Sequence, residues 1–214
     1  MDAVRVALLR EALAGTEWLR DTRRFAGTLR GSVGAHGGGL LLVGTADYEP
    51  WHLAAHLDDE AAWSGLTELS PTLVRHRPPP GAPAHLSVGL GRLEAAGRGE
   101  TLLVVAEGSA GEGLLERVHD ARRGGATVLA LDGTPDGGPA PDGGPAAVAR
   151  TDLRSLAHEA LAVPDSAGLD LDTVQHLVSA AAGENGPVPG VRGRRFRDRL
   201  ARLADQLSAP PNRW

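Results

Sequence analysis

The sequence predicts an α/β protein with a doubly wound parallel sheet in a three-layer, flavodoxin-like sandwich. Near-continuous apolar runs occupy 40–43, 102–105 and 126–131, as is typical of strands covered on both faces. Segments with helical apolar spacing alternate with these runs. This alternation favours right-handed βαβ crossovers. At 214 residues, one α/β domain with extra helices is expected.

Periodicity and breaker residues predict the elements of the first half of the chain. One or two helices are expected over 2–30, divided at Gly15-Thr16, and the glycine-rich segment 31–39 is interpreted as a linker. The elements expected next are a strand at 40–43, a helix that begins at Pro50, an extended piece over 69–74, a proline-rich turn at 78–83 and a helix over 85–97.

The second half continues the alternation of strand and helix. The elements expected there are a strand at 102–105, a glycine-rich loop at 108–113, a helix at 114–123, strands at 126–131 and 159–163, and helices at 172–182 and 194–207. The repeated PDGGPA unit within 135–146 predicts a flexible loop. The organisation is therefore N-terminal helices at 1–37, an α/β domain at 38–183, and a linker with a basic C-terminal helix at 184–214.

Composition excludes several kinds of chemistry. The chain has no cysteine, and all 22 basic residues are arginine, so thiolate metal sites, Walker-type phosphate loops and Schiff-base catalysis are ruled out. Residues 1–190 carry 25 acidic and 15 basic side chains, whereas 191–214 carry 2 and 7. Only the basic C-terminal helix could attract nucleic acid. We find no signal-peptide core and no membrane-spanning run, so a cytoplasmic location is expected.

The segment from Gly44 to Leu57 is the first candidate site. It follows the strand at 40–43 and opens a helix at Pro50, a favoured residue at the first helical position. His52 and His56 are four residues apart, which places both imidazoles on one helix face about 6 Å apart. Such a pair can hold one metal ion, although histidines at this spacing also occur without any ligand role.

The order and spacing of several blocks resemble the sugar isomerase (SIS) superfamily, and most closely the phosphoheptose (sedoheptulose 7-phosphate) isomerases. The similarity covers about residues 25–183. The blocks that carry it are Gly38–Gly44, His52–Leu57, Glu100–Val105, Ala121–Leu131 and Ala160–Pro164. The resemblance implies the doubly wound fold, a sugar-like ligand and assembly into a homodimer or homotetramer through N-terminal helices, for which the apolar stripe Val4–Leu13 is suited.

The resemblance also implies a metal site. Metal-containing members of the family bind zinc through a histidine and a glutamate on the helix after the first loop, with a glutamine and a histidine from a late helix. His52 matches the first histidine, His56 replaces the glutamate that usually acts as base, and His176 is the candidate late histidine, with Asp172 one turn before it. The glutamine has no clean counterpart. We therefore expect His52, His56 and His176 as ligands of Zn²⁺ or another divalent ion, and His56, His176 and Glu107 as candidate catalytic groups.

The two loops after the strands at 40–43 and 102–105 correspond to the family's phosphate cradle. The expected ligand-binding residues are Gly44, Thr45, Asp47, Glu107, Ser109, Gly111 and Asp172. Up to four carboxylates, those of Asp47, Glu49, Glu107 and Glu112, stand where the resemblance implies that a dianionic phosphate docks. Because like charges a few ångströms apart repel by roughly 1–4 kcal/mol, this pattern argues against a standard phosphosugar substrate.

Three functional hypotheses follow. The first is a metal-dependent aldose–ketose isomerase, or a related lyase, acting on a sugar-like polyol. The second is a non-catalytic SIS-like module that senses a ligand or docks a partner, as the loss of loop hydroxyls suggests. The third is a site for an amino sugar or another cationic ligand, as the acidic loops suggest.

Overall fold

Five parallel strands form the centre of the structure, a computed structural model that describes residues 17–36, 38–133, 152–163 and 170–184. Their order across the sheet is β2-β1-β3-β4-β5. The strands are β1 (Leu40–Val43), β2 (Pro71–Val74), β3 (Thr101–Ala106), β4 (Thr127–Asp132) and β5 (Glu159–Ala162). Since every pair is parallel, the predicted doubly wound sheet is confirmed.

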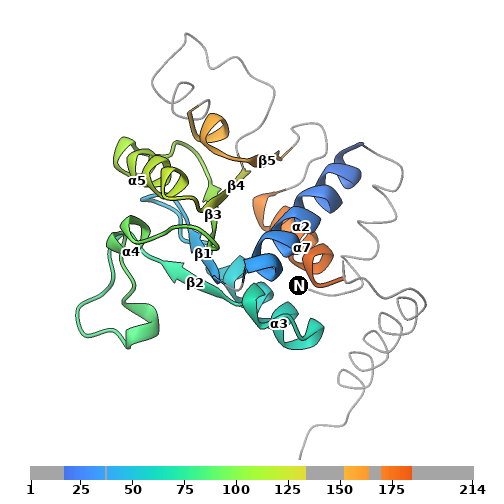
Figure 1. Cartoon of the computed structure of the whole chain (residues 1–214), viewed down its shortest axis with the longest axis horizontal. Helices are drawn as coiled ribbons and strands as arrows, with labels where there is room; N and C mark the ends of the chain where they lie inside the picture. The colour runs from blue at the N-terminus through green and yellow to red at the C-terminus, as the bar shows by residue number, and fades with distance from the viewer. Residues whose placement is uncertain (1–16, 37, 134–151, 164–169, 185–214) are drawn as a thin grey trace, which may run out of the picture.

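Helices cover both faces of this sheet (Figure 1). One face carries α2 (Glu17–His36), α3 (Trp51–Ser64) and α7 (Leu171–Glu184), and the other carries α4 (Gly91–Glu94) and α5 (Glu112–Arg123). Two short 3₁₀ helices, η1 (Thr67–Leu69) and η2 (Ala84–Leu86), lie on either side of β2 in the chain. The helix α7 packs against both α2 and α3, which explains why most of its side chains are buried.

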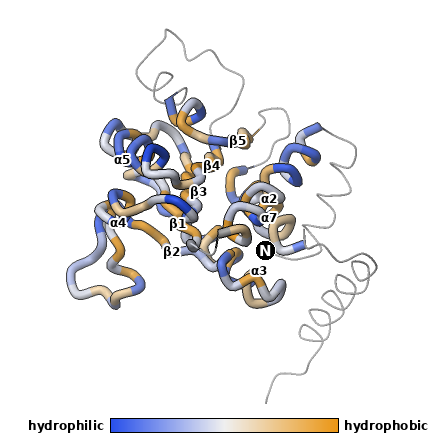
Figure 2. The backbone as a smooth tube through the Cα atoms, viewed as in Figure 1, coloured by the Kyte–Doolittle hydropathy of each residue, from blue (hydrophilic) through white to orange (hydrophobic). Residues whose placement is uncertain are grey.

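Alternate residues of β1, β2, β3 and β4 enter two separate cores. In β1, Leu40 and Leu42 join the core beneath α2, α3 and α7, whereas Leu41 and Val43 join the core beneath α4 and α5. Successive strand side chains point to opposite faces, so a strand between two helical layers must be apolar throughout. The central strands β1, β3 and β4 are accordingly hydrophobic along most of their length (Figure 2).

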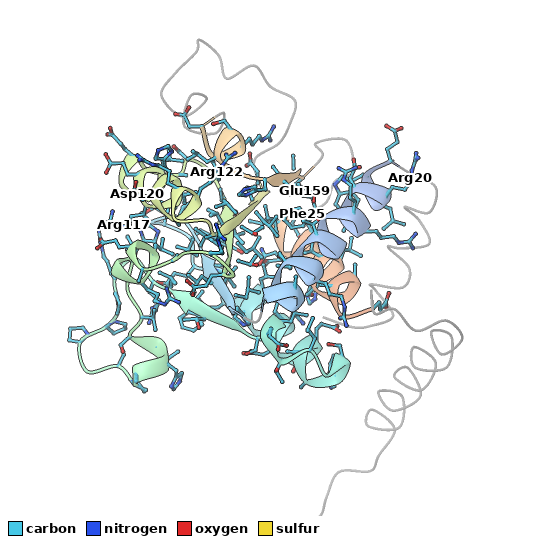
Figure 3. All side chains as sticks on the ribbon, viewed as in Figure 1. Arg20, Phe25, Arg117, Asp120, Arg122 and Glu159 are labelled. Atoms are coloured by element: carbon cyan, nitrogen blue, oxygen red, sulfur yellow. The ribbon has the colours of Figure 1, made fainter. Side chains whose placement is uncertain are left out.

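The helix α2 is longer than the sequence predicted. Residues 31–36 are helical rather than a linker, because Val33 is fully buried in the same core as Phe25 and Leu29. Figure 3 shows Phe25 directed toward the sheet and Arg20 directed away from it. Burial of this apolar face outweighs the cost of about 1 kcal/mol for a glycine such as Gly31 or Gly34 inside a helix.

The predicted helix over 85–97 is wrong. This segment instead contains η2, an isolated parallel bridge between Arg75 and Gly89, and the four-residue α4. The Arg75 amide donates to the Val88 carbonyl at 2.8 Å, so the backbone at 88–89 pairs with the end of β2 and cannot continue a helix. The helical spacing was misleading because the apolar residues of this segment pack against the sheet although their backbone is mostly irregular.

Several sequence predictions fall outside the described residues. They are the apolar stripe Val4–Leu13, the repeat within 135–146 and the helix over 194–207. Within the described part of the chain, no helix has both the length and the apolar character needed to cross a membrane.

The strand order places a topological switch between β1 and β3. The chain runs from β1 to β2 on one side, and then crosses to β3 on the other side of β1. In open parallel sheets, ligands bind at such a switch, beyond the carboxyl ends of the strands. The loops that leave β1 and β3, at 44–50 and 107–111, therefore border the expected site.

Candidate metal and ligand site

Two helices bring three histidines to the carboxyl edge of the sheet. The helix α3 follows β1 and α7 follows β5, so both begin at that edge, and the two helices pack against each other. His52 and His56 lie on the first two turns of α3, and His176 lies on the second turn of α7. Residues 52, 56 and 176, which the sequence singled out as metal ligands, thus converge in space. We call them the histidine triad.

The triad meets through its outer ring nitrogens. The Nε2 atom of His52 lies 2.6 Å from Nε2 of His176 and 3.1 Å from Nε2 of His56. The ring centroids of His56 and His176 are 3.9 Å apart. One ligand atom from each residue can be chosen so that all three lie within 4.8 Å of one another.

Burial favours the neutral form of His56 and His176. His176 is 4% exposed, and this burial, with the neighbouring His56 and His52, lowers its pKa from 6.5 to about 4. Burial also lowers the pKa of His56, and the nearby His52 acts in the same direction. A neutral imidazole keeps a lone pair, which is the form that binds a metal.

The donor set fits a divalent cation better than it fits hydrogen bonding alone. A neutral ring nitrogen carries either one proton or one lone pair, yet Nε2 of His52 faces two nitrogens at once. One proton or one lone pair cannot serve both contacts well. Nitrogens bound to zinc at 2.0–2.1 Å lie about 3.3 Å apart around a tetrahedral ion, close to the separations found here. Three histidines that leave one position open are also a typical donor set of a catalytic zinc site.

The first loop is shaped by its backbone. A Cβ atom at Gly44 would lie 1.8 Å from the Tyr48 carbonyl oxygen, so only glycine fits there. The Gly44 carbonyl contacts Nε2 of His76 at 3.0 Å. Thr45 is 2% exposed and its hydroxyl has no hydrogen-bond partner among the described residues, whereas Asp47 is exposed. The Thr45 hydroxyl is thus turned away from any ligand in the surrounding solvent.

The charge of Glu49 is balanced by Arg75, the residue that follows β2. The Arg75 guanidinium pairs with the Glu49 carboxylate at 2.9 Å, and the indole Nε1 of Trp51 donates to the same carboxylate at 2.7 Å. The guanidinium also lies 4.8 Å from the centroid of the Trp51 ring, within cation–π range. Glu49 therefore fastens the loop to β2 and adds no free charge to the site.

A polar cluster lies at the start of α7, where the sequence predicted Asp172 but not its partners. Gln175 is fully buried, and its Nε2 donates to the Tyr48 hydroxyl at 2.6 Å and to Asp172 at 3.4 Å. The Tyr48 hydroxyl lies 3.5 Å from Oδ1 of Asp172. Neither Tyr48 nor Gln175 was proposed from the sequence, and the available signal was that each lies within four residues of a triad histidine.

The second loop contributes one nearby charge. Glu107, Ser109 and Gly111 are all exposed, and Gly111 is the residue before the first turn of α5. Burial is the main effect that raises the pKa of Tyr48. The hydrogen bond with Gln175 opposes it, and the carboxylates of Asp172 and Glu107 each raise the pKa by a smaller amount. Glu107 therefore approaches Tyr48 from across the switch between β1 and β3. We call Tyr48, Glu107, Asp172 and Gln175 the edge cluster.

Comparisons with known proteins give a fold but no sequence family. No protein-family model and no curated protein sequence matches the chain. Among solved structures, it is similar to a protein of Salmonella typhimurium LT2 assigned to sugar binding, with a TM-score of 0.51 and 15% identity over 92% of this chain and 51% of that one. The chain thus spans about half the length of that protein.

Two further solved structures have lower scores. A Silicibacter pomeroyi DSS-3 protein assigned as a phosphosugar isomerase has a TM-score of 0.48 and 15% identity, over 94% of this chain and 53% of that one. The Vibrio vulnificus NanR protein, complexed with ManNAc-6P, has a TM-score of 0.46 and 12% identity, over 96% and 73%. The likeness to the Salmonella protein, the highest of the three scores, shows that this chain has the same three-layer α/β fold.

Proposed function

We propose that this protein is an SIS-type protein that binds a sugar-like polyol at the carboxyl edge of its sheet, next to a divalent metal ion held by His52, His56 and His176. The observation that carries the proposal is the meeting of three histidine ring nitrogens beside the switch point. The fold shared with a protein assigned to sugar binding supports it. So does the resemblance of the sequence blocks to phosphoheptose isomerases.

The reaction best suited to these residues is aldose–ketose isomerisation. A bound divalent ion would polarise a carbonyl oxygen of the sugar. Histidines that bind the ion cannot also accept protons, so His56 and His176 act as ligands, and the proton acceptor is a carboxylate, Glu107 or Asp172. Tyr48 stays protonated at neutral pH because its pKa is raised, and it can therefore donate a hydrogen bond to a sugar oxygen.

Zinc titration of metal-free protein tests the metal site. Calorimetry should show one Zn²⁺ per chain, and His52→Ala should weaken binding at least tenfold, because His52 contacts both other histidines. The matched control is His119→Ala, an exposed histidine of α5 on the opposite face of the sheet, which should bind zinc as the wild type does. If no zinc binds, or if the two variants behave alike, the metal site is wrong.

Proton exchange tests the isomerase. An isomerase that works through an enediol should exchange a C–H proton of its sugar for deuterium in heavy water, and Glu107→Gln or Asp172→Asn should slow this exchange at least tenfold. NMR on a panel of ketoses and their phosphates measures the exchange. The control Glu116→Gln changes an exposed acid of α5 and should leave the rate unchanged.

A second candidate, non-catalytic ligand sensing, is favoured by one observation. The Thr45 hydroxyl is buried and has no partner among the described residues, so the first loop offers no exposed hydroxyl from that residue to hold a substrate phosphate. Ligand binding by calorimetry without any deuterium exchange would favour sensing over isomerisation.

A further inference from the structure

The helices α3 and α7 touch at two levels along their length. At the carboxyl edge of the sheet, Nε2 of His52 lies 2.6 Å from Nε2 of His176. Further along both helices, Glu60 of α3 lies against Gly183 of α7. His52, His56 and Glu60 follow one another at four-residue spacing, and residues 176 and 183 are seven apart. Residues at these spacings share one helix face, so the triad and the contact of Glu60 with Gly183 belong to the same interface.

The absence of a side chain at Gly183 allows this close approach. A Cβ atom there would lie 1.8 Å from Oε2, 2.7 Å from Cδ and 3.2 Å from Cβ of Glu60. Rotation of the Glu60 side chain could move Oε2 and Cδ, but its Cβ is fixed to the backbone of α3. Glu60 is also only 5% exposed, so its carboxylate has little room to turn. A methyl group at position 183 would therefore push the backbone of α7 away from that of α3.

The last turn of α7 is also held by α2. Arg30 donates to the Ala182 carbonyl at 2.9 Å, which occupies one of the carbonyl groups that a helix end leaves without an internal partner. Both α2 and α3 pack against α7, on the same side of the sheet (Figure 1). Most side chains of α7 between Leu171 and Ala182 are buried, and closely packed interiors transmit displacements. A shift at Gly183 is therefore passed along α7 toward His176.

We infer that Gly183 and Glu60 are positioning residues for the histidine triad. They set the separation of α3 and α7, and with it the place of His176 relative to His52 and His56. They act from two helical turns away, about 10 Å along α7. Zinc–ligand distances vary by only about 0.2 Å, so a shift of a few tenths of an ångström at His176 is enough to weaken binding. This inference rests on the metal site proposed above.

Zinc calorimetry on two glycine variants tests the inference. Gly183→Ala should weaken zinc binding about tenfold, as substitutions around the ligands of a metal commonly do. The matched control is Gly31→Ala in α2, where a Cβ atom meets nothing within 4 Å. Both variants replace a helix glycine with a better helix former, but only one adds a contact. Gly31→Ala should bind zinc as the wild type does, and equal affinities in the two variants would overturn the inference.

A conservative rescue identifies Glu60 as the partner. Glu60→Asp keeps the carboxylate and shortens the side chain by one methylene, so in the double variant with Gly183→Ala only the 3.2 Å contact between Cβ atoms remains. The double variant should recover most of the lost affinity and bind zinc about twofold more weakly than Glu60→Asp alone. This second comparison also serves if Gly183→Ala does not fold. A double variant that binds no better than a folded Gly183→Ala, or exactly as Glu60→Asp does, contradicts the inference.

A readout without metal separates this inference from the metal site. The ring centroids of His56 and His176 are 3.9 Å apart, so NMR of the metal-free protein should show a nuclear Overhauser effect between the two rings. Gly183→Ala should weaken this effect, and Gly31→Ala should retain it. An effect of unchanged strength in Gly183→Ala refutes the positioning role alone. Wild-type protein that binds no zinc refutes the metal site, and the Overhauser comparison then still decides whether Gly183 positions the histidines.

Discussion

The histidine triad and the loops beside it lie at the same edge of the sheet but are held in different ways. The triad projects from two helices anchored by buried residues such as Leu53, Leu57 and Val174. Asp47, Glu107 and Ser109 instead lie exposed on loops. Packing therefore fixes where the triad stands, whereas loop composition sets the charge that a ligand meets. The charge of such a site can therefore change without disturbing the position of the triad.

Backbone packing in the first loop should give the largest effect. We expect Gly44→Ala to reduce the free energy of unfolding by about 3 kcal/mol, because its Cβ would lie 1.8 Å from a backbone carbonyl that the loop cannot move cheaply. Urea denaturation measures this loss. Gly111→Ala is the matched control in the second loop: a Cβ there meets nothing within 4 Å, so its stability should stay within about 0.5 kcal/mol. Similar losses in both variants would mean that the two loops are equally constrained.

Metal binding at the histidine triad should stabilise the folded protein. At a free zinc concentration of one hundred times the dissociation constant, a ligand that binds only the native state adds about 2.7 kcal/mol. Thermal melting of wild-type protein with and without zinc should therefore show a clear rise in Tm, which His176→Ala abolishes and His119→Ala retains. A rise in Tm that persists in His176→Ala would place the zinc elsewhere.

Acid should destabilise the metal-free protein through the triad. The native pKa of His176 is about 4, below its ordinary value of 6.5, so the unfolded chain binds the proton first as the pH falls. The stabilisation is fully present above pH 6.5 and is lost between 6.5 and about 4. One pKa unit corresponds to about 1.4 kcal/mol, so a loss on the order of 2 kcal/mol is expected once partial solvent screening is included.

Two measurements check this expectation. Urea denaturation across that pH range should show a smaller pH dependence in His176→Leu than in the wild type, while His85→Ala, an exposed histidine, should follow the wild type. NMR titration of the His176 ring in the wild-type protein gives its pKa directly. A ring that titrates near 6.5 would contradict the burial of the triad.

The sequence predicted the sheet well because its strands are buried on both faces. An apolar run such as Leu40–Val43 has few alternatives to a central parallel strand. The histidine triad was also predicted, since residues four apart on α3 must share a face and the family resemblance supplied His176. In contrast, the pairing of the 88–89 backbone with the end of β2 depends on tertiary contacts, so helical spacing there was misleading.

Two members of the edge cluster, Tyr48 and Gln175, could not be predicted for a similar reason. Tyr48 and Gln175 are 127 positions apart, and neither belongs to a sequence motif that would predict their contact. The acidic loops were predicted to face a ligand as one group, but the structure separates them. Glu49 is paired with Arg75, whereas Glu107 acts on Tyr48. A carboxylate stays unpaired or becomes paired according to the residues that surround it in the folded protein. Those residues are distant from it in the sequence.

The smallest predicted effect is spectroscopic and tests the placement of Glu107. The chain has a single tyrosine, so ultraviolet titration of its phenol reports on Tyr48 alone. Its pKa should lie above the ordinary value of 10.0, because burial and the carboxylates of Asp172 and Glu107 disfavour the phenolate. Glu107→Gln should lower that pKa with a stability change within about 0.5 kcal/mol, since the side chain is exposed. The control Glu116→Gln should leave both the pKa and the stability unchanged. An unaltered Tyr48 titration in Glu107→Gln would separate the second loop from the edge cluster, and the charge that a ligand meets would then come from Asp172 alone.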